Sequence, residues 1–141
     1  MDKDDSMFCN CLYYSANALG RVMTRIADEE FAITGLAPSH AFVLIIVNKN
    51  QGIRPGLIAE QMQLSPSTVT RLIEKMEHGG LILRKNVGKI TEVYSTNDGI
   101  KLDMKLHKAW NNLNRMYSTL LDEEKAKSLT SLLYEASKLL P

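Results

Sequence analysis

The sequence predicts a mostly α-helical fold with one small β-hairpin, and three observations support this prediction. Apolar residues recur with a period of about 3.6 residues near both ends of the chain, which is typical of long amphipathic helices. In the middle, a helix start signal at Ser65-Pro66 is followed by a helix stop signal at Gly79-Gly80. Two apolar and β-branched runs then flank a short loop that contains glycine, as the strands of a hairpin do.

Composition narrows the class of protein. A chain of 141 residues, 45% hydrophobic and 23% charged, is long enough for one compact domain and too apolar to be disordered. Its longest apolar run, Ala41–Val47, is far shorter than the roughly 20 residues of a membrane span. The first ten residues, MDKDDSMFCN, are acidic and have no apolar signal core. We therefore expect a cytoplasmic protein with no membrane partner.

The first two predicted helices differ in character. Residues 6–31 have a continuous helical rhythm of apolar residues, and Gly35 breaks it. Ser39 is a suitable N-cap for a second helix over Ala41–Val47. Because this second helix is apolar on nearly all sides, we expect it to be buried.

The next two predicted helices are short and closely spaced. Pro55 suits the first position of a helix over Gly56–Met62. A new helix begins at Ser65 and runs to about His78. Two helices joined by such a tight turn have the spacing of a helix-turn-helix, with Ala59 as the small residue where they touch.

The remaining predicted elements are the hairpin and two long helices. The strands are Leu81–Lys85 and Ile90–Ser95, joined by a loop at 86–88. Long helices follow at 97–120, capped by Thr96, and after the cap residue Asp122. The long helices at both ends of the chain are too extended to pack wholly on the middle segment, so we expect their apolar stripes to pair with another subunit.

The helix from Ser65 to His78 has two contrasting faces. Its apolar face holds Val69, Leu72, Ile73 and Met76. Its polar side is rich in small hydroxyls and ends in cationic groups: Ser65, Ser67, Thr68, Thr70, Arg71 and Lys75. Small hydroxyls allow close approach to a DNA groove, and the guanidinium of an arginine can donate two hydrogen bonds, to guanine O6 and N7. The alternative is an ordinary exposed amphipathic helix with a good cap.

The neighbouring segments favour the DNA-binding interpretation. The following hairpin carries Arg84, Lys85 and Lys89, and a basic hairpin beside such a helix can act as a wing on the adjacent minor groove or backbone. Between Arg54 and Thr91 there are six basic and three acidic residues, although the whole chain has a net charge of only +1. A basic middle segment indicates an anionic partner, here double-stranded DNA.

Over nearly its whole length, the chain resembles the MarR family of bacterial winged helix-turn-helix regulators. The motifs that carry the resemblance are Gly35-Leu36, IRPGLIAEQMQLSPSTVTRLIEKMEHGGLI at 53–82, and YSTNDGI at 94–100. The resemblance implies a winged helix-turn-helix DNA-binding domain at 37–96, flanked by a helical dimerisation region at 6–36 and 97–141.

The resemblance also implies a function. It implies a homodimer, most simply a ligand-responsive repressor, that reads a pseudo-palindrome with recognition helix 65–78 and wing 82–95. Arg54 would lie near a phosphate, and the residues matched to DNA contacts are Ser65, Ser67, Thr68, Thr70, Arg71 and Lys75. In the wing the candidate contacts are Arg84, Lys85 and Lys89, with Lys85 and Lys89 suited to phosphates. Two departures stand out: Gln63 replaces the glycine usual in the turn, and the wing at 84–91 is short and lacks its usual aspartates and tip arginine.

Such a regulator could respond to an oxidant, to a metal ion or to a small organic ligand. Cys9 matches, in position, the reactive cysteine of the hydroperoxide-sensing branch of the family, which makes a redox-sensing regulator one alternative. A metal site lacks a recognisable ligand set: Cys9 and Cys11 are two residues apart, so they point about 200° apart on a helix. The family's usual cleft would instead take a small amphipathic or aromatic ligand, and its candidate lining residues are Tyr13, Tyr14, His40, Phe42 and Trp110.

No enzyme signature is apparent in the sequence. It contains no glycine loop for phosphates and no Ser/His/Asp or Cys/His arrangement that spacing would nominate, so we expect a non-enzyme without a cofactor. The rival to a DNA-binding regulator is a dimeric helical interaction module whose degenerate wing binds no DNA.

Overall fold

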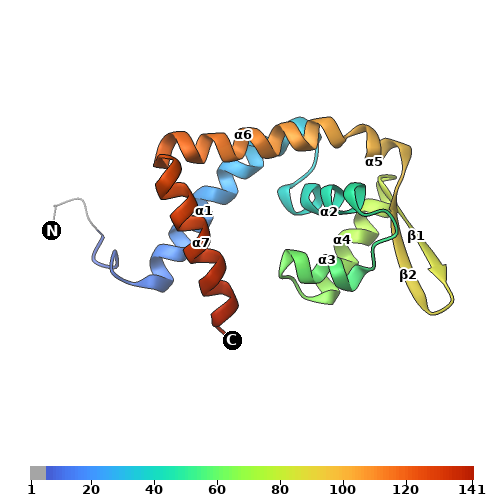
Figure 1. Ribbon diagram of the computed structural model, residues 1–141, viewed down its shortest axis with the longest axis horizontal. Helices are drawn as coiled ribbons and strands as arrows, with labels where there is room; N and C mark the ends of the chain where they lie inside the picture. Colours follow the sequence, from blue (N-terminus) through green and yellow to red (C-terminus); the bar gives the residue numbers. More distant parts are fainter. Residues whose placement is uncertain (1–5) are drawn as a thin grey trace.

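The computed structural model describes residues 6–141 and has the predicted character, mostly helical with one two-stranded hairpin. In chain order the elements are α1 (Leu12–Phe31), the 3-10 turn η1 (Ala32–Thr34), α2 (Pro38–Lys49), α3 (Pro55–Met62), α4 (Pro66–His78), β1 (Ile82–Val87), β2 (Ile90–Ser95), α5 (Asn97–Lys101), α6 (Asp103–Leu121) and α7 (Glu123–Leu139). Figure 1 shows α6 running along the top of the molecule, with α1 and α7 at one end and α2, α3, α4 and the hairpin at the other.

The hydrophobic core lies at the end of the molecule that holds α2, α3 and α4. Helix α2 is central, as its all-round apolar sequence predicts, and it contacts α1, α4, α5, α6 and β2. Its fully buried side chains are Ala41, Val43, Leu44 and Val47. By contrast, α7 has no buried residue within the single chain. One end of the molecule is therefore packed, while the other presents helices with uncovered faces.

Among residues 6–141, no single helix has the length and apolar character of a membrane span. The segments Leu12–Thr34 and Pro38–Lys49 meet such a test only when taken together, across a bend of 56°.

Three predicted boundaries were wrong. Helix α1 begins at Leu12, because residues 7–10 form a turn instead of helix. Helix α2 begins at Pro38 with Ala37 at the N-cap, not at Ser39, since a proline is preorganised for the first helical position and loses no hydrogen bond there. The predicted long helix at 97–120 is interrupted at Leu102, which separates α5 from α6.

The hairpin is longer than the sequence indicated. Strands β1 and β2 pair antiparallel from Ile82 with Ser95 to Val87 with Ile90, so the turn is the two-residue step Gly88-Lys89. Gly88 has φ 64°, the positive value that a two-residue hairpin turn requires at its first position. The expected loop at 86–88 is therefore mostly strand, and Lys89 lies at the tip of the hairpin.

Helix α4 ends in a Schellman motif, as Gly79-Gly80 predicted. The N–H of Leu81 donates to the carbonyl oxygen of Met76, and the N–H of Gly80 donates to that of Glu77. Gly80 takes the left-handed conformation with φ 78°. Glycine suits this position because it has no Cβ to clash there.

Helix α3 ends in the same motif without a glycine. The N–H of Leu64 donates to the carbonyl oxygen of Ala59 at 3.1 Å, and the N–H of Gln63 donates to that of Glu60 at 3.3 Å. Gln63 has φ 53° and ψ 43°, so glutamine occupies the left-handed position that Gly80 fills after α4. The turn therefore carries backbone strain, because a side chain with a Cβ is disfavoured in this region by about 1–2 kcal/mol.

We predict that Gln63→Gly raises the free energy of unfolding by about 0.5–1 kcal/mol, because glycine relieves the left-handed strain. Urea unfolding followed by circular dichroism measures the change. The control is Gln61→Gly, two residues earlier and inside α3, where glycine should lower stability by about 0.5–1 kcal/mol. A loss of stability in both variants would contradict the strain at residue 63.

Candidate nucleic-acid interface

The two faces of α4 lie in different environments. Val69, Ile73 and Met76 are buried in the core. The opposite side is solvent-exposed and carries the predicted DNA-contacting residues Ser67, Thr70, Arg71 and Lys75, while Thr68 is half-buried. Helix packing therefore orients a hydroxyl-rich and cationic surface outward, which is the geometry that a major-groove helix needs.

The hydroxyls at the start of α4 bond to one another and to the helix. Ser65 is the N-cap, and its Oγ accepts from the N–H of Thr68 at 3.3 Å and lies 2.8 Å from the Thr68 Oγ1. Thr70 Oγ1 donates to the carbonyl oxygen of Pro66 at 2.9 Å. The Arg71 Nε donates to the carbonyl oxygen of Ser67 at 3.4 Å. All of these bonds are local and exposed, so exchange for phosphate or base-edge partners costs little.

Arg84 joins the wing to α4. Its Nη2 lies 2.9 Å from the Glu77 Oε1, its backbone N–H donates to the Glu77 Oε2, and its Nη1 lies 3.9 Å from the Glu74 Oε1. The guanidinium, predicted to contact DNA, is thus paired with carboxylates of α4. This arrangement fixes the first residues of β1 relative to the end of α4.

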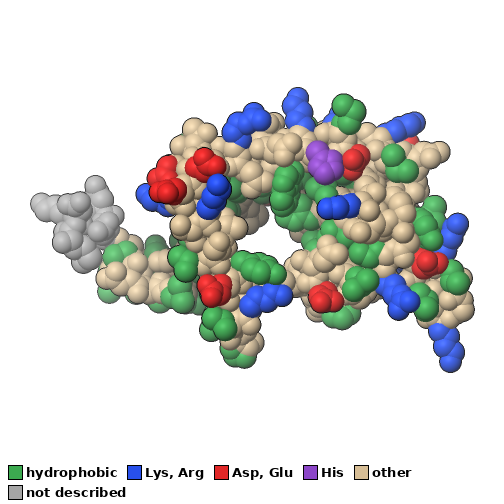
Figure 2. Space-filling model, in the orientation of Figure 1, with side chains coloured by type: hydrophobic (Ala, Val, Ile, Leu, Met, Phe, Trp, Pro, Cys, Tyr) green, Lys and Arg blue, Asp and Glu red, His purple; other side chains and the backbone are tan. Residues whose placement is uncertain are grey.

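The remaining predicted cations differ in their surroundings. The Lys85 Nζ lies 5.2 Å from the centroid of the Tyr94 ring, a cation–π contact across the hairpin. Lys89 is exposed at the hairpin tip, and Arg54 is exposed at the N-cap of α3. Figure 2 shows Lys and Arg side chains around the hairpin end of the molecule. Lys89 and Arg54 are therefore open to phosphates, whereas Arg84 is held by α4.

The ion pair between Glu77 and Arg84 should make the stability of the fold depend on pH. The hydrogen bond from Arg84 lowers the pKa of Glu77 below its ordinary value of 4.5, so the pair stabilises the fold above that pH. This stability is lost as the pH falls through the lowered pKa. Because both side chains are partly exposed, we expect Glu77→Gln to cost at most about 1 kcal/mol at pH 7.

Urea unfolding of wild type and Glu77→Gln between pH 7 and pH 3 measures this effect. The two stability curves should converge at the acidic end. The matched control is Glu123→Gln, which removes the more exposed pair with Lys127 on α7 and should change stability less. A constant difference between wild type and Glu77→Gln at every pH would contradict the assignment.

The predicted ligand-cleft residues do not meet at one site in the single chain. Phe42 and Trp110 stack edge to face at 5.4 Å between centroids. They belong to a cavity of about 410 Å³ whose lining comes from α2, the end of α3, α6 and α7: Phe42, Ile45, Ile46, Gln61, Met62, Gln63, Trp110 and Tyr134. Tyr13 and Tyr14 lie in the first turn of α1 and do not line it.

His40 lines a different cavity, of about 300 Å³, beside Lys75 and Met76 of α4. Its Nε2 is buried without a hydrogen-bond partner. Burial first, and the nearby Lys75 second, lower the pKa of His40 below its ordinary value of 6.5. The separation of His40 from Phe42 could have been predicted from the sequence, because residues two apart on a helix point about 200° apart.

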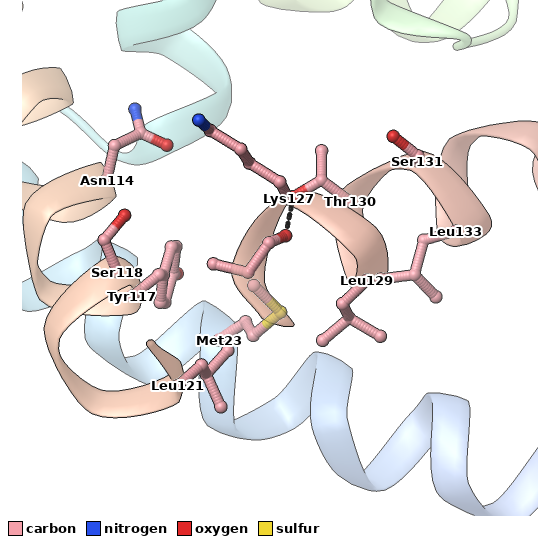
Figure 3. A pocket seen from close by; sticks show the side chains of 11 residues that line it. Met23, Asn114, Tyr117, Ser118, Leu121, Lys127, Leu129, Thr130, Ser131 and Leu133 are labelled. Atoms are coloured by element: carbon pink, nitrogen blue, oxygen red, sulfur yellow. Dashed lines mark hydrogen bonds between the residues drawn. The ribbon is translucent and has the colours of Figure 1, made fainter. Parts of the chain in front are cut away.

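A third cavity, of about 420 Å³, lies between α1, α6 and α7. Figure 3 shows side chains of all three helices around it, with Met23, Leu121 and Leu129 among them. Sequence reasoning did not identify this cavity, although the apolar stripes of the long helices form its walls. It belongs to the end of the molecule where helix faces are uncovered.

The cysteines and histidines form no cluster within residues 6–141. Cys9 and Cys11 are exposed free thiols at the start of the described chain. The His107 Nε2 lies 3.5 Å from the Asp103 Oδ2, one turn away on α6. In this part of the chain, no three metal-ligating side chains lie close enough to hold an ion.

Comparisons with known proteins agree with this geometry. The family model described as MarR family matches residues 36–86. The HTH-type transcriptional repressor MdtR of Bacillus subtilis (strain 168) is 30% identical over 116 residues, which cover 78% of this chain and 75% of MdtR.

Two solved structures share the fold. The S. aureus MepR–DNA complex matches with a TM-score of 0.79 at 20% identity, over 92% of this chain and 98% of MepR. The PcaV regulator of Streptomyces coelicolor, solved with its natural ligand, matches with a TM-score of 0.83 at 14% identity, over 96% and 97% of the two chains. Together, the relative, the family model and the fold establish that this chain belongs to the MarR family of transcriptional regulators.

Proposed function

We propose that this regulator is a ligand-responsive repressor that acts as a homodimer in the cytoplasm. In this proposal, residues 37–96 form the DNA-binding domain, and residues 6–36 and 97–141 form the dimerisation region. Each subunit reads one half of a pseudo-palindromic site with recognition helix 65–78, and the wing 82–95 contacts the flanking backbone.

The observation that carries the proposal is the outer face of α4. Its hydroxyls and cations are exposed, while the opposite face of the same helix is anchored in the core by Val69, Ile73 and Met76. A rigidly mounted, exposed polar helix with a basic hairpin beside it can enter a major groove without rearranging the fold. The exposed Arg54 and Lys89 supply phosphate contacts on either side.

Uncovered apolar side chains at the other end support the homodimer. Large apolar residues of α1, α6, α7 and the C-cap of α7 are exposed in the single chain: Leu12, Tyr13, Val22, Leu120, Leu132, Leu133, Tyr134, Leu139 and Leu140. Exposed apolar surface of this extent on helices is typical of a subunit interface. A second copy of the chain would cover it and bring two α4 helices onto one DNA molecule.

The relatives support both a DNA partner and a small ligand. MepR was solved with DNA, PcaV was solved with its natural ligand, and MdtR is a repressor. In this chain, the cavity lined by α2, α3, α6 and α7 lies between the proposed dimerisation region and the helix-turn-helix. A ligand there would act on the angle between the two regions, and so on the spacing of the two recognition helices.

The test is binding to the DNA upstream of the chain's own gene. Fluorescence anisotropy should give a tight complex whose affinity falls steeply with salt, because lysine and arginine release counterions from phosphates. Footprinting should protect two half-sites about 10 base pairs apart, and light scattering should give two chains per site. A scrambled duplex of equal length is the control. Equal affinity for the upstream and scrambled duplexes at low salt would overturn the proposal.

A further inference from the structure

At one register position, the hairpin is held from both of its edges. Arg84 of β1 pairs with Val93 of β2. On the β2 side, the N–H of Val93 donates to the carbonyl oxygen of Ile53 at 2.9 Å, and the N–H of Gly52 donates to that of Val93 at 2.8 Å. On the β1 side, the N–H of Arg84 donates to the Glu77 Oε2 of α4 at 3.1 Å. The base of the wing is therefore attached both to the segment before α3 and to the end of α4.

The side chain of Arg84 reinforces the attachment to α4. Its Nη2 lies 2.9 Å from the Glu77 Oε1 and its Nε lies 3.3 Å from the Glu77 Oε2, so the guanidinium binds the carboxylate with two hydrogen bonds. The Glu74 Oε1 is farther away, at 3.9 Å from Nη1. Beyond Arg84, within the part of the chain that the structure describes, β1 makes hydrogen bonds only to β2. The outer part of β1 therefore takes its direction from this contact with Glu77.

The tip of the wing is far enough from Arg84 for its position to depend on that contact. Figure 1 shows the hairpin extending away from the helices, and Lys89 lies in its turn. Because a strand rises about 3.3 Å per residue, the tip lies about 13 Å beyond Arg84, and a tilt of about 15° at the base would move it by about 3 Å. Such a displacement is as long as a hydrogen bond, so it would separate Lys89 from a phosphate.

The three cations of the wing differ in their freedom to bind phosphates. Arg84 is held by Glu77, Lys85 lies over the Tyr94 ring, and Lys89 is exposed at the tip. If Arg84 moved to a phosphate, it would exchange one charge-assisted, two-bond contact for another. The carboxylate of Glu77 would then be left unpaired beside an anionic duplex, where like charges repel. The geometry therefore favours an Arg84 that stays on α4.

We infer that Arg84 is a positioning residue, which stays bound to Glu77 in the DNA complex and aims the wing so that Lys89 meets the backbone. The carboxylate of Glu77 thereby promotes DNA binding, although it is an acid close to the DNA-facing surface. This inference rests on the proposed DNA-binding function. It gives Arg84 a different role from the direct DNA contact that the sequence led us to expect.

The sign of the effect of Glu77→Gln on DNA affinity tests the inference. If Arg84 positions the wing, this variant should bind the upstream duplex about three- to eight-fold more weakly, because one lysine–phosphate contact is worth about eight-fold at 0.1 M salt. If Arg84 instead binds a phosphate, removal of the competing carboxylate should strengthen binding. Affinity equal to or tighter than that of wild type overturns the inference.

Glu74→Gln is the matched control, because it removes the same charge from the same helix and leaves the two-bond contact of Glu77 intact. It should not weaken DNA binding. An equal loss of affinity in Glu74→Gln and Glu77→Gln would mean that the contact between Glu77 and Arg84 is not the cause, and would also overturn the inference.

Two further variants separate positioning from direct contact. Arg84→Lys keeps the charge but cannot form the two-bond contact, so it should weaken DNA binding as Glu77→Gln does, whereas a simple phosphate contact would tolerate lysine. In the Lys89→Ala background, Glu77→Gln should change the affinity by less than about two-fold, since the contact that it positions is already absent. Wild-type affinity for Arg84→Lys, or a full loss in the Lys89→Ala background, would contradict the positioning role.

Hydrogen–deuterium exchange without DNA reports on the attachment itself. The amides of residues 85–91 should exchange faster in Glu77→Gln than in wild type or Glu74→Gln, with circular dichroism confirming that all three are folded. Unchanged exchange contradicts the inference whatever the protein binds. If wild type binds the upstream and scrambled duplexes equally, only the proposed regulator is contradicted, because a backbone contact of Lys89 should still make Glu77→Gln weaker on both duplexes.

Discussion

Replacing Gly99 with alanine should destabilise the fold by about 3 kcal/mol or more, as expected for severe overpacking of a buried site. Gly99 is buried in α5, directly against the connection between α4 and β1. A Cβ at this position would lie 2.3 Å from the carbonyl oxygen of Leu81 and 3.2 Å from the Leu44 Cδ1. The first contact is with backbone, which cannot rotate away as a flexible side chain can.

The surrounding hydrogen bonds prevent an easy shift of α5. The carbonyl oxygen of Leu81 accepts from the N–H of Thr96 at 3.0 Å, and the Thr96 Oγ1 accepts from the N–H of Gly99 at 3.2 Å. On the other side, the Asn48 Nδ2 donates to the carbonyl oxygen of Gly99 at 3.2 Å. Moving Gly99 away from Leu81 would therefore break the cap of α5 and its link to α2.

Urea unfolding measures the loss, with Gly56→Ala as the matched control. Gly56 lies in the first turn of α3, and a Cβ there meets no atom within 4 Å. Alanine at 56 should leave stability unchanged or raise it by up to about 1 kcal/mol. Similar stability for Gly99→Ala and Gly56→Ala would show that the packing around Leu81 is looser than the structure indicates.

Replacing Arg71 with alanine should weaken binding to the cognate DNA by about 1–3 kcal/mol and blur its sequence preference. Arg71 is exposed on the outer face of α4, and its Nε makes only a long bond, at 3.4 Å, to the carbonyl oxygen of Ser67. The guanidinium can therefore leave this contact for a guanine edge. Anisotropy titrations with the upstream site and with single-base variants of it measure both effects.

Lys89→Ala is the comparison for Arg71→Ala. Lys89 lies at the hairpin tip, where it can meet a phosphate. Its loss should weaken binding to all sequences alike and reduce the slope of log affinity against log salt by about one. If both variants lose sequence preference to the same degree, the assignment of base contacts to Arg71 and of phosphate contacts to Lys89 is wrong.

Local signals in the sequence predicted much of this fold. Ser65-Pro66 and Gly79-Gly80 start and stop α4 because caps and left-handed positions depend on residues adjacent in the chain. Asp122 likewise caps α7, accepting from the N–H of Lys125 at 2.9 Å. One error arose where a local signal had a stronger competitor nearby, as Ser39 had in Pro38.

In the candidate site, too, some features follow from the sequence and others only from the tertiary structure. The sequence by itself determined that α4 has one apolar and one polar face, since a helical period places residues on faces whatever they pack against. Only the tertiary structure decided that Arg84 pairs with Glu77 and that Gln63 meets Ser137. The last contact joins residues 74 positions apart. Contacts of this kind depend on how whole helices are placed against one another, and no local pattern of residues encodes that placement.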